Sequence, residues 1–72
     1  MKYTVLIEQG PTSFGASVPD LPGCIAVAAT REEVIRLIRE AIVFHIEGLK
    51  LQGEAVPAAS SHLELVAVNV AA

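Results

Sequence analysis

Few side chains in this 72-residue sequence could do chemistry: one thiol, two imidazoles and a pair of adjacent serines. Cys24, His45 and His62 are too few and too far apart in the sequence for a structural zinc site, which takes four ligands. Ser60 and Ser61 directly precede His62, but a catalytic triad is recognised by its arrangement in space and not by adjacency. We therefore expect Cys24 to be a small buried apolar side chain and His62 to lie at the surface.

The most distinctive segment is a proline-rich loop with the sequence Val18-Pro19-Asp20-Leu21-Pro22-Gly23-Cys24. Its two prolines fix φ and remove two amide donors, so neither a helix nor a central strand can pass through it, and Gly23 is free to take positive φ. A pre-shaped loop loses little entropy on binding, so we expect it to present Asp20 and Leu21 to a partner, with Asp20 pairing to a cation. The predicted contact residues are Pro19, Asp20, Leu21, Pro22, Gly23 and Cys24. The alternative is a rigid strand connection that serves stability alone.

The composition favours association with other chains. The sequence is 53% hydrophobic, yet a single core of this size supplies only about 3–5 kcal/mol of net stability without a disulfide or a metal. We therefore expect a homo-oligomer, a dimer or a tetramer, that buries the apolar surplus. Eight acidic residues against five basic ones give a net charge of −3, which suits a basic partner and argues against direct contact with nucleic acid.

The apolar pattern predicts four strands and one helix that position these residues. The predicted strands are 2–8, 14–18, 24–29 and 62–70. Thr30, followed three residues later by Glu33, forms a capping box, and Gly53 suits the position just beyond a helix, so a helix is expected over 31–52. His45 falls on the apolar side of that helix, where we expect a core or interface position.

The order β-β-β-α-β predicts an α+β fold and limits its topology. Three strands in a meander leave the third parallel to the first, and a helical crossover returns the fourth beside the first. The result is a mixed sheet of order 3-2-1-4 with one helix packed on one face and the other face bare. Both sides of the fourth strand are apolar, which implies cover on both sides. We expect this strand to supply the oligomer interface, through Leu65, Val66, Val68 and Val70.

The pattern favours a cytoplasmic protein of a single domain, residues 1–72. The stretch 34–51 is interrupted by five charged residues and a histidine, so it falls short of the roughly 18 apolar residues that span a membrane. A strand pattern begins at Lys2, and we expect no signal peptide before it.

Together these segments resemble the HicB family of antitoxins. The proline-rich run is a specific part of the match, and the matching pieces follow one another in the family's order over almost the whole chain. They are residues 3–8, 14–24, 30–33, 40–42, 45–47 and the linker 53–57.

The resemblance implies both a fold and a function. HicB-like proteins have a partial RNase H-like β-β-β-α-β fold and neutralise HicA, a small basic toxin that cleaves mRNA. The resemblance therefore implies an antitoxin of a type II toxin–antitoxin system with a HicA-like partner, and neither enzymatic activity nor a cofactor or metal. Many relatives add a C-terminal helix-turn-helix or ribbon-helix-helix that binds the operon's promoter, and we expect no such DNA-binding domain within residues 1–72.

Two alternatives stay open. Nucleases of the RNase H-like fold draw metal-binding carboxylates from strand one, the first helix and strand four, where this sequence has Glu8, Glu40 and Glu64. Solvated surface acids explain the same three residues, and a fold alone does not establish a function. The second alternative is a self-assembling protein without a toxin.

Overall fold

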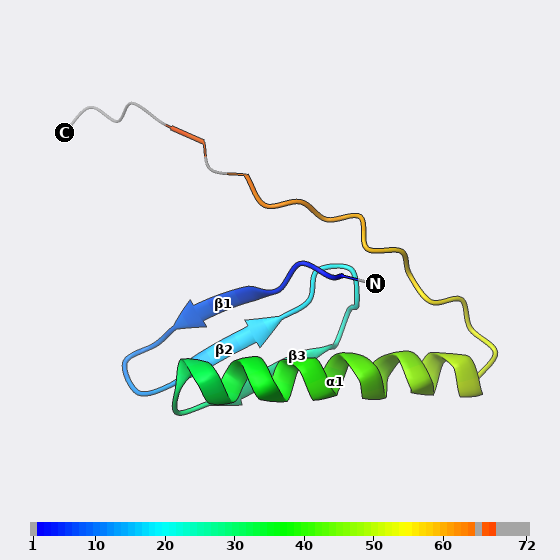
Figure 1. Cartoon of the computed structure of the whole chain (residues 1–72), viewed down its shortest axis with the longest axis horizontal. Helices are drawn as coiled ribbons and strands as arrows, with labels where there is room; N and C mark the ends of the chain where they lie inside the picture. The colour runs from blue at the N-terminus through cyan, green and yellow to red at the C-terminus, as the bar shows by residue number, and fades with distance from the viewer. Residues whose placement is uncertain (1, 65, 68–72) are drawn as a thin grey trace.

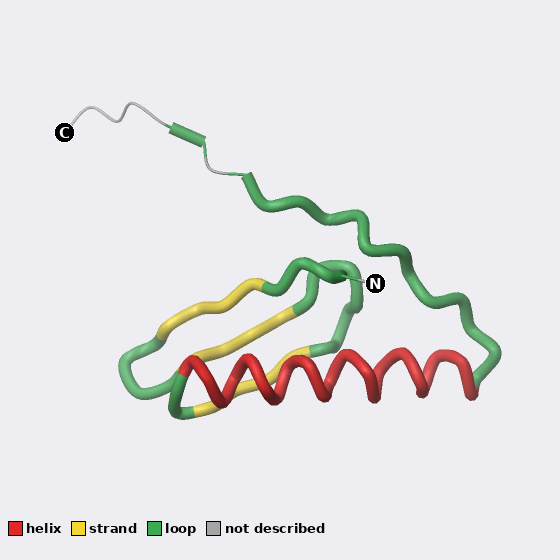
Figure 2. Tube along the Cα trace, viewed as in Figure 1, coloured by secondary structure: helices red, strands yellow, loops and turns green. Residues whose placement is uncertain are grey.

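The computed structural model describes residues 2–64 and 66–67. A three-stranded meander is followed by one long helix. The elements are β1 (Leu6–Gln9), β2 (Phe14–Ser17), β3 (Ile25–Ala28) and α1 (Arg31–Leu51). The helix crosses one face of the sheet, and the chain then returns past the amino-terminal end as an extended segment (Figures 1 and 2).

The sheet alternates strictly between a face turned to the helix and a face turned away from it. In the antiparallel ladder Ile7 of β1 lies opposite Ala16 of β2, which in turn lies opposite Ala26 of β3. All three side chains belong to the hydrophobic cluster beneath the helix, as period-two alternation requires. The large apolar side chains exposed on the opposite face are Leu6, Ile25 and Val27. The expected bare sheet face is confirmed among the described residues.

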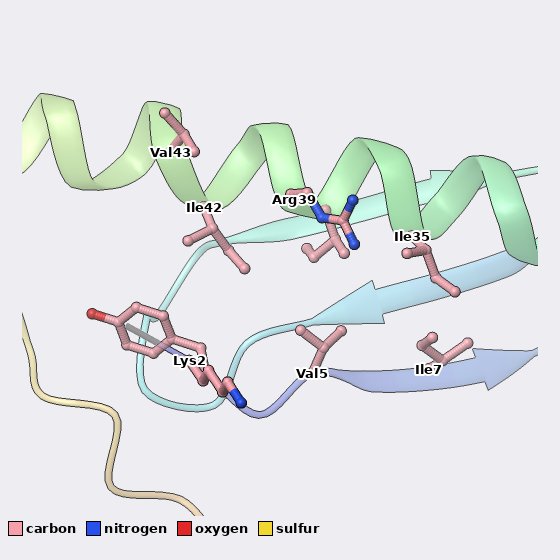
Figure 3. A pocket seen from close by; sticks show the side chains of 9 residues that line it. Lys2, Val5, Ile7, Ile35, Arg39, Ile42 and Val43 are labelled. Carbon is pink, nitrogen blue, oxygen red and sulfur yellow. The ribbon is translucent and has the colours of Figure 1, made fainter.

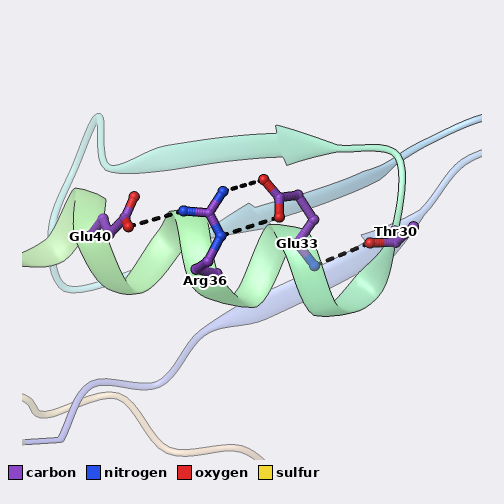
Figure 4. Close-up of polar contacts among 4 residues, drawn as sticks. All are labelled: Thr30, Glu33, Arg36 and Glu40. Carbon is purple, nitrogen blue, oxygen red and sulfur yellow. Dashed lines mark hydrogen bonds and ion pairs between the residues drawn. The ribbon is translucent and has the colours of Figure 1, made fainter.

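The start of α1 is capped as the sequence indicates, with one difference. The amide of Glu33 donates to Thr30 Oγ1 at 3.1 Å, which satisfies one of the free donors of the first turn. The Glu33 carboxylate does not reach back to complete the capping box. It binds the guanidinium of Arg36 instead, and Arg36 also donates to Glu40 at 3.0 Å (Figure 4). The hydrogen bond that Arg36 donates to the carboxylate of Glu33 lowers the pKa of Glu33. The helix ends before Gly53, whose φ is 72°, as predicted.

The hydrophobic core lies where α1 crosses β2 and β3, and the helix does not cover β1. The buried core consists of Ala16, Val18, Leu21, Cys24, Val34 and Ile38. A helix of 21 residues is roughly 31 Å long and a strand of four roughly 13 Å, so the second half of α1 projects beyond the sheet (Figure 1). Phe44 and Leu51 on that half are exposed. No helix in the described part of the chain is long and apolar enough to cross a bilayer.

The sequence predicted the first three strands and the helix in the right order, over somewhat longer spans. The predicted fourth strand is not observed: residues 62–64 and 66–67 have no strand structure, and the residues just before them are held at the proline-rich loop and at Thr4 by the hydrogen bonds of Ser60 and Ser61. The observed sheet order is β1-β2-β3. A fourth strand beside β1 remains a prediction. Of the expected interface residues, Val66 is exposed, whereas Leu65, Val68 and Val70 lie outside the described residues.

Candidate functional site

The proline-rich loop joins β2 to β3 and is closed by its own backbone. The amide of Val18 donates to the carbonyl of Cys24 at 3.2 Å, which joins the two ends of the loop. The amides of Leu21 and Cys24 donate to the carbonyls of Val18 and Leu21, each at 3.0 Å. Gly23 has φ 85°, a left-handed conformation that strains any residue with a Cβ. The loop is therefore held by three hydrogen bonds in addition to its two prolines.

The side chains of this loop divide into an outer set and an inner set. Pro19, Pro22 and Gly23 are exposed, whereas Leu21, with 0% of its surface accessible, and Cys24 lie in the core. The expectation that Leu21 is presented at the surface is wrong. The turns direct it inward, where burial of a leucine contributes about 1.5–3 kcal/mol. The expected burial of Cys24 is confirmed, and this burial raises the pKa of its thiol.

Asp20 forms a clasp with two serines that are 40 and 41 positions further along the chain. Its Oδ2 accepts hydrogen bonds from the amides of Ser60 and Ser61, both at 3.0 Å. Its Oδ1 accepts from the two serine hydroxyls, at 3.2 Å and 2.8 Å respectively. These donors favour the charged carboxylate and lower the pKa of Asp20, with the bonds from Ser61 the largest cause. We call Asp20, Ser60 and Ser61 the Asp20 clasp.

Two further bonds hold the same segment against the start of the chain. The hydroxyl of Tyr3 donates to the carbonyl of Pro57 at 2.6 Å, and the hydroxyl of Thr4 donates to the carbonyl of Ser61 at 2.8 Å. Together with the clasp, these bonds fix residues 57–61 beside the proline-rich loop and the residues just before β1. The linker after α1 is thus docked by polar contacts and not by burial of large apolar side chains.

An apolar groove of about 510 Å³ runs between β1 and α1, because the helix lies over β2 and β3 only (Figure 3). Ile7 of β1 and the preceding residues Tyr3 and Val5 form one wall of this groove. Its helix wall consists of Ile35, Ile38, Ile42 and Val43, and the two charged side chains in its lining are Lys2 and Arg39.

The remaining candidate residues do not converge on one site. His45 is half-buried beside the exposed Phe44, and His62 is exposed, as predicted. Within residues 2–64 and 66–67, no group of three or more His, Cys, Asp or Glu side chains could hold a metal ion. Glu8, Glu40 and Glu64 therefore form no carboxylate cluster there.

Neither the clasp nor the groove was predicted from the sequence. Two adjacent serines 40 positions from an aspartate have no spacing that marks them as its partners. The groove depends on how far the helix is displaced across the sheet, which apolar periodicity does not specify.

The chain is similar to known proteins over most of its length. The family profile described as "HicB_like antitoxin of bacterial toxin-antitoxin system" matches residues 3–70. A UPF0150 protein of Thermoplasma acidophilum is 41% identical over 58 residues, which cover 79% of this chain and 84% of that protein.

An uncharacterised 14.9 kDa protein from the rep-hol intergenic region of Haemophilus phage HP1 is 40% identical over 57 residues. These residues cover 79% of this chain, but the chain spans only 43% of the length of the phage protein. No solved structure matches the chain significantly.

Proposed function

The chain belongs to the family of HicB-like antitoxins of bacterial toxin–antitoxin systems, and we propose that it neutralises a small basic mRNA-cleaving toxin of the HicA kind by direct binding. Membership of an antitoxin family points to a non-enzymatic role with a toxin as partner. The net charge of −3 suits a basic partner. Since such a toxin acts on mRNA, we place the protein in the cytoplasm.

The observation that carries this proposal is the rigid loop at residues 18–24. Its outer side chains Pro19, Pro22 and Gly23 are exposed, and its backbone is already ordered, so little entropy is lost on binding. Leu21 and Cys24 support the contact surface from below. Asp20 has two acceptor bonds on each oxygen, so a toxin cation that approaches it must displace a serine donor.

Self-association completes the proposed architecture. Thr4 binds Ser61 just before β1 begins, so the following residues start beside a free sheet edge. We place residues 62–70, of the same copy or of a second one, at that edge as a fourth strand, which gives the RNase H-like order 3-2-1-4. The homo-oligomer would then be built on Leu65, Val66, Val68 and Val70. This single-domain unit would act without direct contact to nucleic acid.

A charge placed on the loop tests the proposed toxin contact. Pro22→Lys adds a cation to the outer set, and repulsion of a basic toxin should weaken binding about tenfold or more. Pro11→Lys is the matched control, because Pro11 is also exposed and lies in the turn between β1 and β2. Binding to the basic protein encoded by the neighbouring gene is measured by calorimetry, and growth rescue by co-expression.

Two results would contradict the proposal. One is the absence of binding between the unmodified chain and that basic protein at micromolar concentration. The other is equal weakening by Pro22→Lys and Pro11→Lys, which would move the contact away from the loop.

A further inference from the structure

The groove between β1 and α1 is an incomplete part of the fold. In a complete sheet–helix layer the helix would cover Val5 and Ile7. Here α1 packs on β2 and β3 and does not reach β1, so these two side chains stay uncovered. β1 is also an edge strand, with β2 as its one neighbour in the described sheet. An unpaired edge beside an open apolar groove is a template for one more strand.

The charges on this groove specify the kind of strand that fits. No acidic residue lines it, although acids outnumber bases in the chain. The two cations in its lining, Lys2 and Arg39, form no ion pair within the described part of the structure. The complementary occupant is an extended apolar segment that carries a negative charge.

The chain itself offers such a segment, since residues 62–64 and 66–67 are exposed and outside any helix or strand. Leu63 is 72% exposed and Val66 is 74% exposed, and Glu64 lies between them. Six extended residues span roughly 20 Å, enough to run beside β1 and beyond it. The same segment thus combines exposed apolar side chains with the one negative charge that the groove would accept.

The segment does not occupy the groove of its own copy. The Asp20 clasp fixes Ser60 and Ser61, and residues 62–64, which follow, run away from both β1 and α1 (Figure 1). The radius of gyration is 14.7 Å, whereas a compact chain of this length has about 11 Å. The segment thus projects from the domain, its start is held by the Asp20 clasp, and the β1 edge that would complement it is open. This arrangement is typical of an element that is exchanged between two copies of a chain.

We propose that residues 62–67 of one copy dock along β1 and the groove of a second copy, with Glu64 meeting Arg39, and that the exchange is reciprocal. Two such contacts related by a two-fold axis close the assembly as a dimer and leave no free β1 edge. The inference rests on the self-association in the proposed function and adds the surface that receives the strand. The exposed loop at residues 18–24 is not part of this interface.

A charge-exchange experiment tests the proposal on the full chain. Arg39→Glu and Glu64→Lys each place two like-charge contacts in a dimer, so each should weaken dimerisation about tenfold in sedimentation equilibrium. An equimolar mixture should regain the affinity of the unmodified chain, because each heterodimer interface then joins opposite charges. The control mixture replaces Arg39→Glu by Arg31→Glu, an exposed arginine outside the groove; its heterodimer keeps one like-charge contact and should stay weaker than the heterodimer of Arg39→Glu with Glu64→Lys.

Several outcomes would overturn the exchange. They are an unmodified chain that stays monomeric at millimolar concentration, a mixture no tighter than its components, and a dimer that persists in Val66→Asp with an unchanged helical spectrum. Docking of the segment within its own copy would give the first two of these results. A toxin-binding measurement separates the antitoxin role from the strand exchange. If a monomeric variant still binds the toxin, the antitoxin role stands without the exchange. If the chain dimerises but binds no toxin, only the antitoxin role is contradicted.

Discussion

Two regions of this small chain are attached to the domain by different forces. The proline-rich loop is anchored by burial, with Leu21 in the core beneath α1. Residues 57–61 are anchored by hydrogen bonds to Asp20, Tyr3 and Thr4, all near the surface. Net hydrogen bonds contribute less than the burial of a large side chain, because the unfolded chain forms them with water. The loop should therefore unfold with the whole domain, whereas the C-terminal segment can detach by itself.

The largest expected effect comes from removing the apolar anchor of the loop. Leu21→Ala should lower the free energy of unfolding by about 2–5 kcal/mol, which is as large as the net stability expected of so small a domain. Circular dichroism during urea unfolding measures the change. The control is Leu51→Ala, a leucine that is 89% exposed at the end of α1 and should shift stability by less than about 0.5 kcal/mol. Equal effects of the two variants would mean that Leu21 does not anchor the loop.

A smaller effect is expected from the backbone of the same loop. Gly23 has φ 85° and open space where a Cβ would stand, so Gly23→Ala tests conformational strain without a clash. The expected loss is about 1–2 kcal/mol. Gly15→Ala is the matched control, since its Cβ would also meet open space and its φ is not positive. The free energy of unfolding is measured by the same urea titration. If Gly23→Ala leaves it unchanged, the loop adopts another backbone conformation.

The next smaller loss of stability is expected from removal of the helix cap at Thr30. Thr30→Ala leaves the amide of Glu33 without its acceptor, which should cost about 1 kcal/mol. Thr30→Ser retains the hydroxyl and should restore most of that stability, as measured by thermal unfolding. A Thr30→Ser variant as unstable as Thr30→Ala would assign the loss to the methyl group and not to the cap.

The sequence predicted the elements that depend on local chemistry. The Thr30 cap, the glycine at position 53 and the alternation around Ile7 follow from rules that operate within a few residues, and each is confirmed. The inward direction of Leu21 was missed, because polar and proline neighbours indicate a loop but not which way one side chain turns.

The long-range features were not predictable for a different reason. The Asp20 clasp joins residues 40 positions apart through side chains that any surface loop contains. The fourth strand was predicted from apolar alternation, and that pattern specifies a strand only where a partner edge is in reach. In this structure the clasp holds Ser60 and Ser61, and residues 62–64, which follow, form no strand, so local periodicity and tertiary contacts disagree at this point of the chain.

The smallest expected effect on global stability comes from the clasp itself. Asp20→Asn removes the negative charge and replaces one acceptor oxygen by an amide donor that faces the serine donors. The amides of Ser60 and Ser61 should then exchange with deuterium at nearly the unprotected rate, while the amides of β2 and α1 keep their protection. Glu54→Gln is the control, since this exposed acid of the same linker takes no part in the clasp. Loss of protection throughout the core would contradict the distinction between the two regions.

Acid should release the clasp in the unmodified chain in the same way. The pKa of Asp20 is lowered from 3.8 in the folded state, so the clasp contributes its full stabilisation at every pH above that ordinary value. The contribution is lost as the pH falls through the lowered pKa, when the carboxyl binds a proton and gives up its acceptor bonds. Exchange at Ser60 and Ser61, corrected for the intrinsic pH dependence of the exchange rate, should be flat from pH 7 to about pH 4 and should rise below it. In Asp20→Asn the corrected rate should be high throughout, and an acid transition that survives in this variant would belong to another group.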